Sequence, residues 1–162
     1  MPVDPNLDPP IKGRYNGFDV YPMPMFMRLE TRDLAATVGW YREALEFGVM
    51  LEMPMMAHLR RKKFQDLLVF GSANGNAPAQ GLAIAFEAEG EVDTIWRRAL
   101  DATPVGLARV EGSPRVMPWN ARELQVIDPD GRRLIFHEQT KDAGAAARMG
   151  AMFDPTSKAG AS

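Results

Sequence analysis

Two stretches near the C-terminal end of the chain alternate between apolar and polar positions. Residues 123–127 and 133–137 each place an apolar side chain at every second position. This alternation is typical of half-buried β-strands, because successive side chains point to opposite faces of a sheet. The Asp-Pro-Asp-Gly sequence at 128–131 supplies turn chemistry between them, since proline fixes φ and glycine accepts a positive φ. The pattern predicts a hairpin with one apolar face and one mixed face, and a mixed face of this kind indicates a sheet that lines a ligand cavity.

The first third of the chain predicts a strand followed by a helix. Residues 25–30 alternate as a strand, and apolar side chains then follow at helical spacing from residue 34 to residue 45. Asp33 is the expected N-cap of this helix, and Gly48 is expected to end it. Further strands at 49–56, within a methionine-rich hairpin at 49–58, and at 67–70 complete a β-α-β-β-β unit.

The same order of elements returns in the second half of the chain. Residues 82–88 predict a strand, residues 92–102 a helix, and a strand near 108–111 precedes the hairpin. The helix is expected to turn four apolar side chains inward: Val92, Ile95, Trp96 and Ala99. The repeat spacing of ~55 to 60 residues exceeds solenoid periods and indicates a duplicated half-domain.

These patterns together predict an α+β fold. It consists of two tandem β-α-β-β-β modules, at 23–79 and 80–140, whose curved mixed sheets enclose a ligand cleft within one domain. Residues 1–22 are rich in proline and predict an extended N-terminal arm, with residues 15–21 packing on the domain or on a partner subunit. Residues 141–162 are rich in alanine and glycine and predict a weakly ordered tail.

Composition narrows the class of protein without naming an activity. The 162 residues are 46% hydrophobic and 25% charged, which is typical of a single globular domain. The net charge of −2 argues against nucleic-acid binding, and the lack of cysteine excludes disulfides, thiolate nucleophiles and thiolate metal sites. No apolar run is long enough to span a membrane and no signal peptide is evident, so a cytoplasmic location is expected.

Two motifs at opposite ends of the chain resemble a known superfamily. The sequence PWNARELQVIDPDGRRLIFHEQ at 118–139 is similar to the last third of the vicinal oxygen chelate superfamily, which includes glyoxalase I, extradiol dioxygenases and bleomycin resistance proteins. LETRDL at 29–34 and WYREALEFG at 40–48 are similar to the family's first strand, helix and closing glycine. The C-terminal motif is closest in character to the drug-binding resistance proteins, with one extra residue between tryptophan and strand. This resemblance covers about residues 23–139 and implies a homodimer with clefts at the subunit boundary.

The resemblance also locates where catalytic members hold a divalent cation. The corresponding places fall at Phe26, at Ile135, at Ala83 or a neighbour, and within residues 67–70. None of these side chains offers the carboxylate, imidazole or amide oxygen that such a cation needs. We therefore expect neither a metal ion nor another cofactor.

Two histidines leave an altered metal site open as an alternative. His58 and His137, with Glu30 or Glu123, would supply the donors of a facial triad. The simpler interpretation makes His137 a hydrogen-bonding wall residue and His58 a surface-loop residue. Similarly, Glu30 and Glu123 either form an ion-pair network with neighbouring cations or orient a polar ligand, and the basic run at 60–63 is expected to be a solvated turn.

Trp119 is the strongest candidate for ligand contact. It lies in a loop between proline and asparagine, outside any helical spacing, and its flat ring suits stacking on a planar ligand. The resemblance assigns the same role, because the tryptophan of this motif contacts ligand in the drug-binding relatives. Trp40 and Trp96 lie at apolar helix positions and are expected in the core. A methionine cluster at 50–56 provides either an adaptable apolar wall or ordinary core filling.

The sequence therefore predicts a metal-free protein that binds and sequesters a planar, partly apolar natural product, as antibiotic resistance proteins do. An enzyme of the same fold, a lyase, isomerase or dioxygenase with a relocated metal or none, is the alternative. No catalytic residue is assigned. The residues expected to contact ligand are Trp119, Phe26, Arg28, Glu30, Met55, Met56, His58, Glu123, Gln125, Ile135 and His137.

Overall fold

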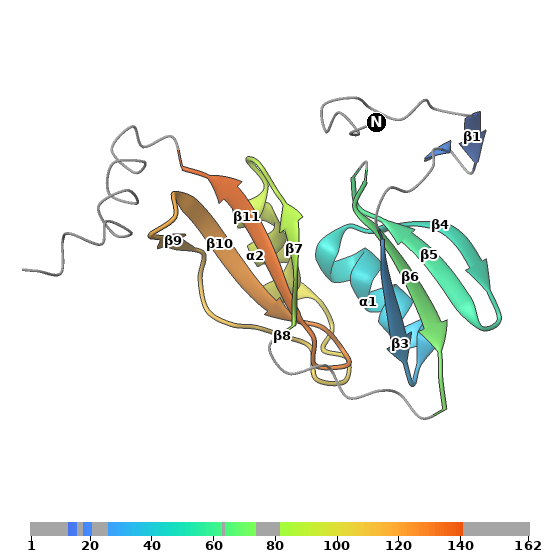
Figure 1. Cartoon of the computed structure of the whole chain (residues 1–162). Helices are drawn as coiled ribbons and strands as arrows, with labels where there is room; N and C mark the ends of the chain where they lie inside the picture. The colour runs from blue at the N-terminus through green and yellow to red at the C-terminus, as the bar shows by residue number, and fades with distance from the viewer. Residues whose placement is uncertain (1–12, 16–17, 21–25, 63, 74–81, 141–162) are drawn as a thin grey trace, which may run out of the picture. The chain divides into compact units, whose positions relative to one another are not determined.

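A computed structural model describes residues 13–15, 18–20, 26–62, 64–73 and 82–140. The chain forms two compact units, Met1–Asn76 and Ala77–Ser162 (Figure 1). Among the described residues, the main sheet of the first unit has four strands and that of the second has five, each accompanied by one helix, and both sheets mix parallel and antiparallel pairs. This confirms the predicted α+β class and the two modules. Neither sheet closes into a barrel.

The first sheet is built from β3 (Met27–Thr31), β4 (Gly48–Met53), β5 (Met56–Arg60) and β6 (Asp66–Gly71), in the spatial order β3-β6-β5-β4. The first and last strands in sequence, β3 and β6, lie side by side and parallel. Helix α1 (Leu34–Leu45) packs on β4, β5 and β6. The sheet residues buried in this unit's core include Leu29, Ala57, Leu59, Leu67 and Val69.

The hairpin expected at 49–58 is present, but its turn divides the strand expected at 49–56. The chain makes a hairpin there, in which Met53 pairs with Met56 and Pro54 and Met55 form the turn. Proline has no backbone N–H to donate to a ladder, so it ends β4 rather than continuing it. As a result, His58 lies within β5 and not in a loop.

The ends of α1 are set by one side chain and one backbone conformation. The Asp33 side chain accepts a hydrogen bond from the Ala36 amide at 2.9 Å, which confirms the predicted N-cap. The helix ends at Glu46, which adopts the left-handed conformation with φ 63°, and Gly48 instead begins β4. This earlier turn brings Phe47 into the core, where its ring meets Tyr41 edge-on at a centroid distance of 5.3 Å.

The second unit contains β7 (Ala83–Glu87), α2 (Val92–Asp101), β8 (Arg109–Val110), β9 (Arg115–Met117), β10 (Ala121–Ile127) and β11 (Arg133–Gln139). The spatial order is β7-β11-β10-β8, and β9 also pairs with β10. Strands β10 and β11 form the predicted hairpin, with Leu124 opposite Phe136. The three-residue β9 lies between two prolines and was not predicted.

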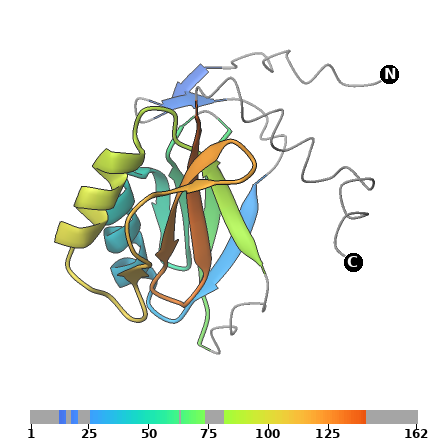
Figure 2. The same ribbon diagram turned by 90° about the vertical axis from the view of Figure 1, so that its left-hand side faces the viewer.

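Helix α2 covers one face of this second sheet, packing on β8, β10 and β11 (Figure 2). Val92 and Ile95 are buried as predicted, whereas Trp96 and Ala99 are only half-buried, so Trp96 is not the core residue that its spacing indicated. By contrast, Trp40 of α1 is buried as expected. The sheet residues buried in the core of the second unit include Ile84, Phe86, Leu124, Val126, Leu134 and Phe136.

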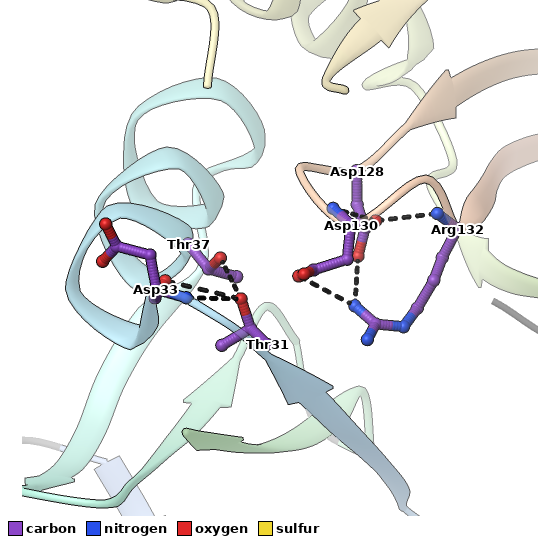
Figure 3. Close-up of polar contacts among 6 residues, drawn as sticks. All are labelled: Thr31, Asp33, Thr37, Asp128, Asp130 and Arg132. Carbon is purple, nitrogen blue, oxygen red and sulfur yellow. Dashed lines mark hydrogen bonds and ion pairs between the residues drawn. The ribbon is translucent and has the colours of Figure 1, made fainter. Parts of the chain in front are cut away.

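The turn between β10 and β11 is organised by the fully buried Asp128. One of its carboxylate oxygens accepts hydrogen bonds from the amides of Asp130 and Arg132, at 3.0 and 2.8 Å (Figure 3). The other oxygen accepts from Arg132 Nη1 at 2.9 Å. Gly131 takes the positive φ of 88° that turn chemistry assigns to glycine.

Strands β1 (Gly13–Tyr15) and β2 (Phe18–Val20) form a small antiparallel ladder within the predicted arm. The rest of that arm and the predicted tail at 141–162 lie outside the described residues. Within the described part of the chain, no helix is long and apolar enough to cross a membrane.

Candidate functional site

Each sheet has one face turned away from the helix of its own unit, here called its distal face. Residues directly opposite one another on paired strands share a face, so the register defines which side chains meet there. On the second sheet, one row across the distal face holds Glu87, His137, Glu123 and Arg115. The next row holds Ala85, Ile135 and Gln125. The mixed face predicted from the sequence is this surface.

Trp119 lies at the tip of the β9–β10 hairpin, at one end of this face. Met117 pairs with Ala121, which leaves a three-residue loop whose last residue, Asn120, adopts the left-handed conformation with φ 63°. Such loops need a left-handed residue in that position, and asparagine tolerates it. The Asn120 carbonyl also accepts a hydrogen bond from the Thr140 amide at 3.1 Å, and the two side chains are hydrogen-bonded. The loop is therefore fastened to the end of β11.

The indole of Trp119 is held at one edge. Its Nε1–H donates to Glu123 Oε1 at 2.8 Å, while the residue remains 50% exposed. Half of the residue's surface is therefore open to solvent. Glu123, which accepts this hydrogen bond, lies opposite His137 on β11.

The distal face of the first sheet is more apolar. One row holds Glu30, Phe70, Met56 and Met53, and the next holds Arg28, Leu68, His58 and Leu51. The guanidinium carbon of Arg28 lies 4.3 Å from the centroid of the Phe70 ring, in cation–π contact.

Three other predicted residues lie at the margins of this face. Arg28 Nη2 is 3.8 Å from Glu30 Oε1, and the pair is partly exposed. Phe26, directly before β3, is 45% exposed. Met55 occupies the tip of the β4–β5 turn and is 64% exposed, so its side chain is outside the rows of the sheet.

A buried charged cluster on the first sheet was missed by sequence reasoning. His58 Nε2 and Arg60 Nε both lie within hydrogen-bond distance of Asp66 Oδ1, at 2.6 and 2.7 Å. Burial raises the pKa of Asp66, but the hydrogen bonds of His58 and Arg60 and their charges outweigh it and leave that pKa below its usual value. Two predictions were wrong here: His58 is not a surface-loop residue, and the basic run does not begin in solvent, because Arg60 is buried. An aspartate directly before the apolar Leu-Leu-Val-Phe stretch was the available signal.

A second network ties α2 to its sheet on the opposite side from the distal face. Arg122 donates to both carboxylate oxygens of Asp93, at 2.6 and 2.9 Å, and to Glu138 at 3.0 Å. The hydrogen bonds from Arg122 lower the pKa of Asp93, and those to Asp93 and Glu138 raise the pKa of Arg122. This network supports the position of the helix and does not reach the predicted contact residues.

The predicted contact residues divide between the two units. Phe26, Arg28, Glu30, Met55, Met56 and His58 belong to the first, and Trp119, Glu123, Gln125, Ile135 and His137 belong to the second. Among the residues that the structure describes, no three His, Asp or Glu side chains gather in a way that could hold a metal ion. In the first unit, the Asp66 carboxylate beside His58 is instead occupied by the Arg60 cation.

Comparison with family models and with curated proteins found no match. Solved structures do match. A bleomycin resistance determinant encoded on the transposon Tn5 is 21% identical, with a TM-score of 0.58 over 73% of this chain and 98% of its own. A bleomycin-binding protein complexed with bleomycin is 21% identical, with a TM-score of 0.57 over 71% and 97%. A glyoxalase/bleomycin resistance protein/dioxygenase from Nocardioides is 20% identical, with a TM-score of 0.57 over 76% and 87%.

These matches confirm the fold that the two sequence motifs indicated. The chain has the fold of the bleomycin resistance and glyoxalase-type proteins.

Proposed function

We propose that this protein binds a planar, partly apolar small molecule through the distal faces of its sheets, without a metal ion and without changing the molecule chemically. Trp119 carries the proposal. Half of this indole is exposed to water and does not contribute to the core. We attribute the exposure to a role in ligand binding, in which the free faces of the ring stack on a ligand. The hydrogen bond to Glu123 fixes one edge of the ring, so that little side-chain freedom is lost when a ligand stacks on it.

Each distal face, taken by itself, offers groups of the kind found in ligand sites. Small-molecule sites are mainly apolar and carry a few fixed polar groups that orient the ligand. Phe70, Leu68 and Met56 supply apolar surface, and methionine adapts to irregular shapes. Gln125 and His137 supply polar groups near Trp119. The shared fold of a protein crystallised with bleomycin supports a drug-like ligand, and sequestration as a form of resistance is part of the proposal.

The test is a fluorescence titration of the parent protein and of Trp119→Ala with a panel of planar antibiotics. We expect Trp119→Ala to bind about tenfold more weakly or worse, because lost stacking adds to lost apolar burial and tenfold corresponds to ~1.4 kcal/mol. Trp119→Phe should keep part of the affinity. The matched control is Trp96→Phe, which changes a half-buried tryptophan on the helix side of the same unit and should bind as the parent does.

Thermal melting without ligand completes this test. Trp119→Ala should melt close to the parent, whereas loss of a core tryptophan costs ~3–5 kcal/mol. A variant that melts far earlier yet still binds with parental affinity would place Trp119 in the core and remove the basis of the proposal.

A second candidate, an enzyme of the same fold, is favoured by one observation. The row Glu87, His137 and Glu123 places an imidazole between two carboxylates, a combination suited to proton transfer. Mass spectrometry of the bound compound after prolonged incubation separates the two functions, because a sequestering protein returns it unchanged. Metal analysis after purification without chelator separates them further, and a stoichiometric transition metal would contradict metal-free binding.

A further inference from the structure

His58 is a polar residue placed inside an apolar part of the first distal face. On β5 it lies between Leu51 of β4 and Leu68 of β6 in the same row. Its side chain is 15% exposed, and Nε2 is engaged with Asp66 Oδ1 at 2.6 Å. The proposed binding function does not explain why this row contains an imidazole.

The contact with Asp66 fixes which ring nitrogen carries hydrogen. Asp66 is ionised at neutral pH, because His58 and Arg60 lower its pKa by more than burial raises it. A carboxylate only accepts hydrogen bonds, so Nε2 must be the donor. The neutral ring then has its lone pair on Nδ1. Among the described residues, no hydrogen bond to His58 Nδ1 is formed.

The surroundings of His58 define what an occupant must offer. Leu51 and Leu68 flank the ring, so a ligand there makes apolar contact beside one hydrogen-bond acceptor. Arg28 lies two strands away in the same row, about 10 Å distant at the Cα atoms from the usual strand spacing. Its guanidinium, stacked on Phe70 and largely exposed, suits an anionic or acceptor group at the other end of the ligand.

We infer that His58 Nδ1 is the acceptor for a weakly acidic hydroxyl, such as a phenol or enol, on a flat ligand whose opposite end meets Arg28. This inference rests on the proposed function and names its ligand class. When the hydroxyl gives up its proton, the O–H bond breaks and an N–H bond forms at Nδ1. The resulting imidazolium is stabilised by the Asp66 carboxylate, and the ligand oxyanion remains beside it.

The first measurement needs no ligand. The chain contains two histidines, so a long-range nitrogen–proton NMR spectrum shows two imidazoles, and His58→Gln assigns them. We expect His58 in a single tautomer with hydrogen on Nε2 and a bare Nδ1. The contact with Asp66 requires this tautomer, and hydrogen on Nδ1 would overturn the inference.

The second measurement uses para-nitrophenol and its methyl ether, para-nitroanisole. Both molecules carry a nitro group for Arg28, but only the phenol donates a hydrogen bond. We expect the phenol to bind about tenfold more tightly and to displace the His58 Nδ1 signal, because a hydrogen bond to a group that becomes charged is among the stronger ones. His58→Gln retains a donor for Asp66 and should reduce the phenol to the affinity of the ether.

The control is Glu52→Gln, at an exposed position of the neighbouring strand β4 outside the proposed contacts, which should leave both affinities unchanged. Equal binding of the two probes, an unmoved Nδ1 signal, or a preference that survives His58→Gln would each overturn the inference. None of these outcomes touches the proposed function, because the Trp119 titration with planar antibiotics is a separate measurement.

Discussion

Asp66 makes a histidine and an arginine compatible with burial in the first unit. Arg60 and Asp66 are 5% and 4% exposed, and the carboxylate binds Arg60 Nε at 2.7 Å and His58 Nε2 at 2.6 Å. Buried charges are tolerated only when they are paired and hydrogen-bonded. The carboxylate therefore supports both the position of Arg60 and the orientation of the proposed ligand acceptor.

Replacing this carboxylate should be costly. We expect Asp66→Asn to lower the free energy of unfolding at pH 7 by about 3 kcal/mol, because Arg60 stays buried without its counter-charge. The folded-state pKa of Asp66 lies below the usual aspartate value of 3.8, so the carboxylate contributes its full stabilisation above that pH and loses it as the pH falls further. Urea unfolding at pH 7 and at acidic pH measures this. The difference between parent and variant should shrink below pH 3.8.

Glu52→Gln is the control for this substitution, since Glu52 lies on the neighbouring strand β4 and is exposed. It should change stability by less than about 0.5 kcal/mol. An Asp66→Asn variant as stable as Glu52→Gln would show that the cluster does not stabilise the fold.

At the scale of single residues, the sequence revealed exposed features better than buried polar ones. Trp119 stood outside every helical or strand period, and its exposure could be predicted from that alone. Asp66 could not be assigned a partner, because Arg60 reaches it through pairing of β5 with β6 and not through sequence spacing. The hydrogen bond from Arg122 to Asp93 could not be predicted for the same reason, because it joins a strand to a helix that is distant in the sequence.

Among the elements, the β10–β11 turn is supported by a neighbouring loop. The Leu107 amide donates to the Pro129 carbonyl at 2.9 Å, which brings Gly106 against the turn. A Cβ at Gly106 would lie 2.4 Å from the same carbonyl oxygen, and Gly106 has a φ of 54°. Only glycine fits this approach.

Two glycine substitutions separate the energetic cost of a positive φ from the cost of a steric clash. Gly112 also has a positive φ, 86°, but a Cβ there would meet nothing within 4 Å. We expect Gly112→Ala to lower the free energy of unfolding by about 1 kcal/mol, the lower end of the range for a non-glycine residue in the left-handed conformation. Gly106→Ala should lower it by about 2 kcal/mol more, because its Cβ clashes with Pro129. Urea unfolding of both variants measures the difference. Equal costs would mean that the loop moves aside freely.

Periodicity predicted the long elements and failed at the short ones. Helix α1 and the β10–β11 hairpin run long enough for their patterns to be clear. Strand β9 has three residues, too few for an alternation to register. The division of 49–56 into two strands depended on reading Pro54 as a turn, and the end of α1 depended on burial of Phe47, which is a tertiary effect.

For the whole molecule, the edges of the sheets bear on assembly. Strands β3 and β4 end the first sheet, and β7 ends the second. Edge strands present unpaired backbone groups that readily pair with another chain, and most soluble oligomers are symmetric dimers. We expect a homodimer at micromolar concentration. Light scattering coupled to gel filtration measures the mass, and the mass of a single chain would contradict this expectation.

The parallel pairing of first and last strands has a consequence for synthesis on the ribosome. Strand β3 pairs with β6, and β7 pairs with β11, so the first strand of each module pairs with its last. Neither sheet can therefore be completed until the last strand of its own module has left the ribosome. All strands of the first sheet precede residue 72, however, so that module can close while the second is still being translated. Contacts between distant parts of a chain are slow to form, and early closure of one module shortens the time for which apolar strands stay exposed to misassembly.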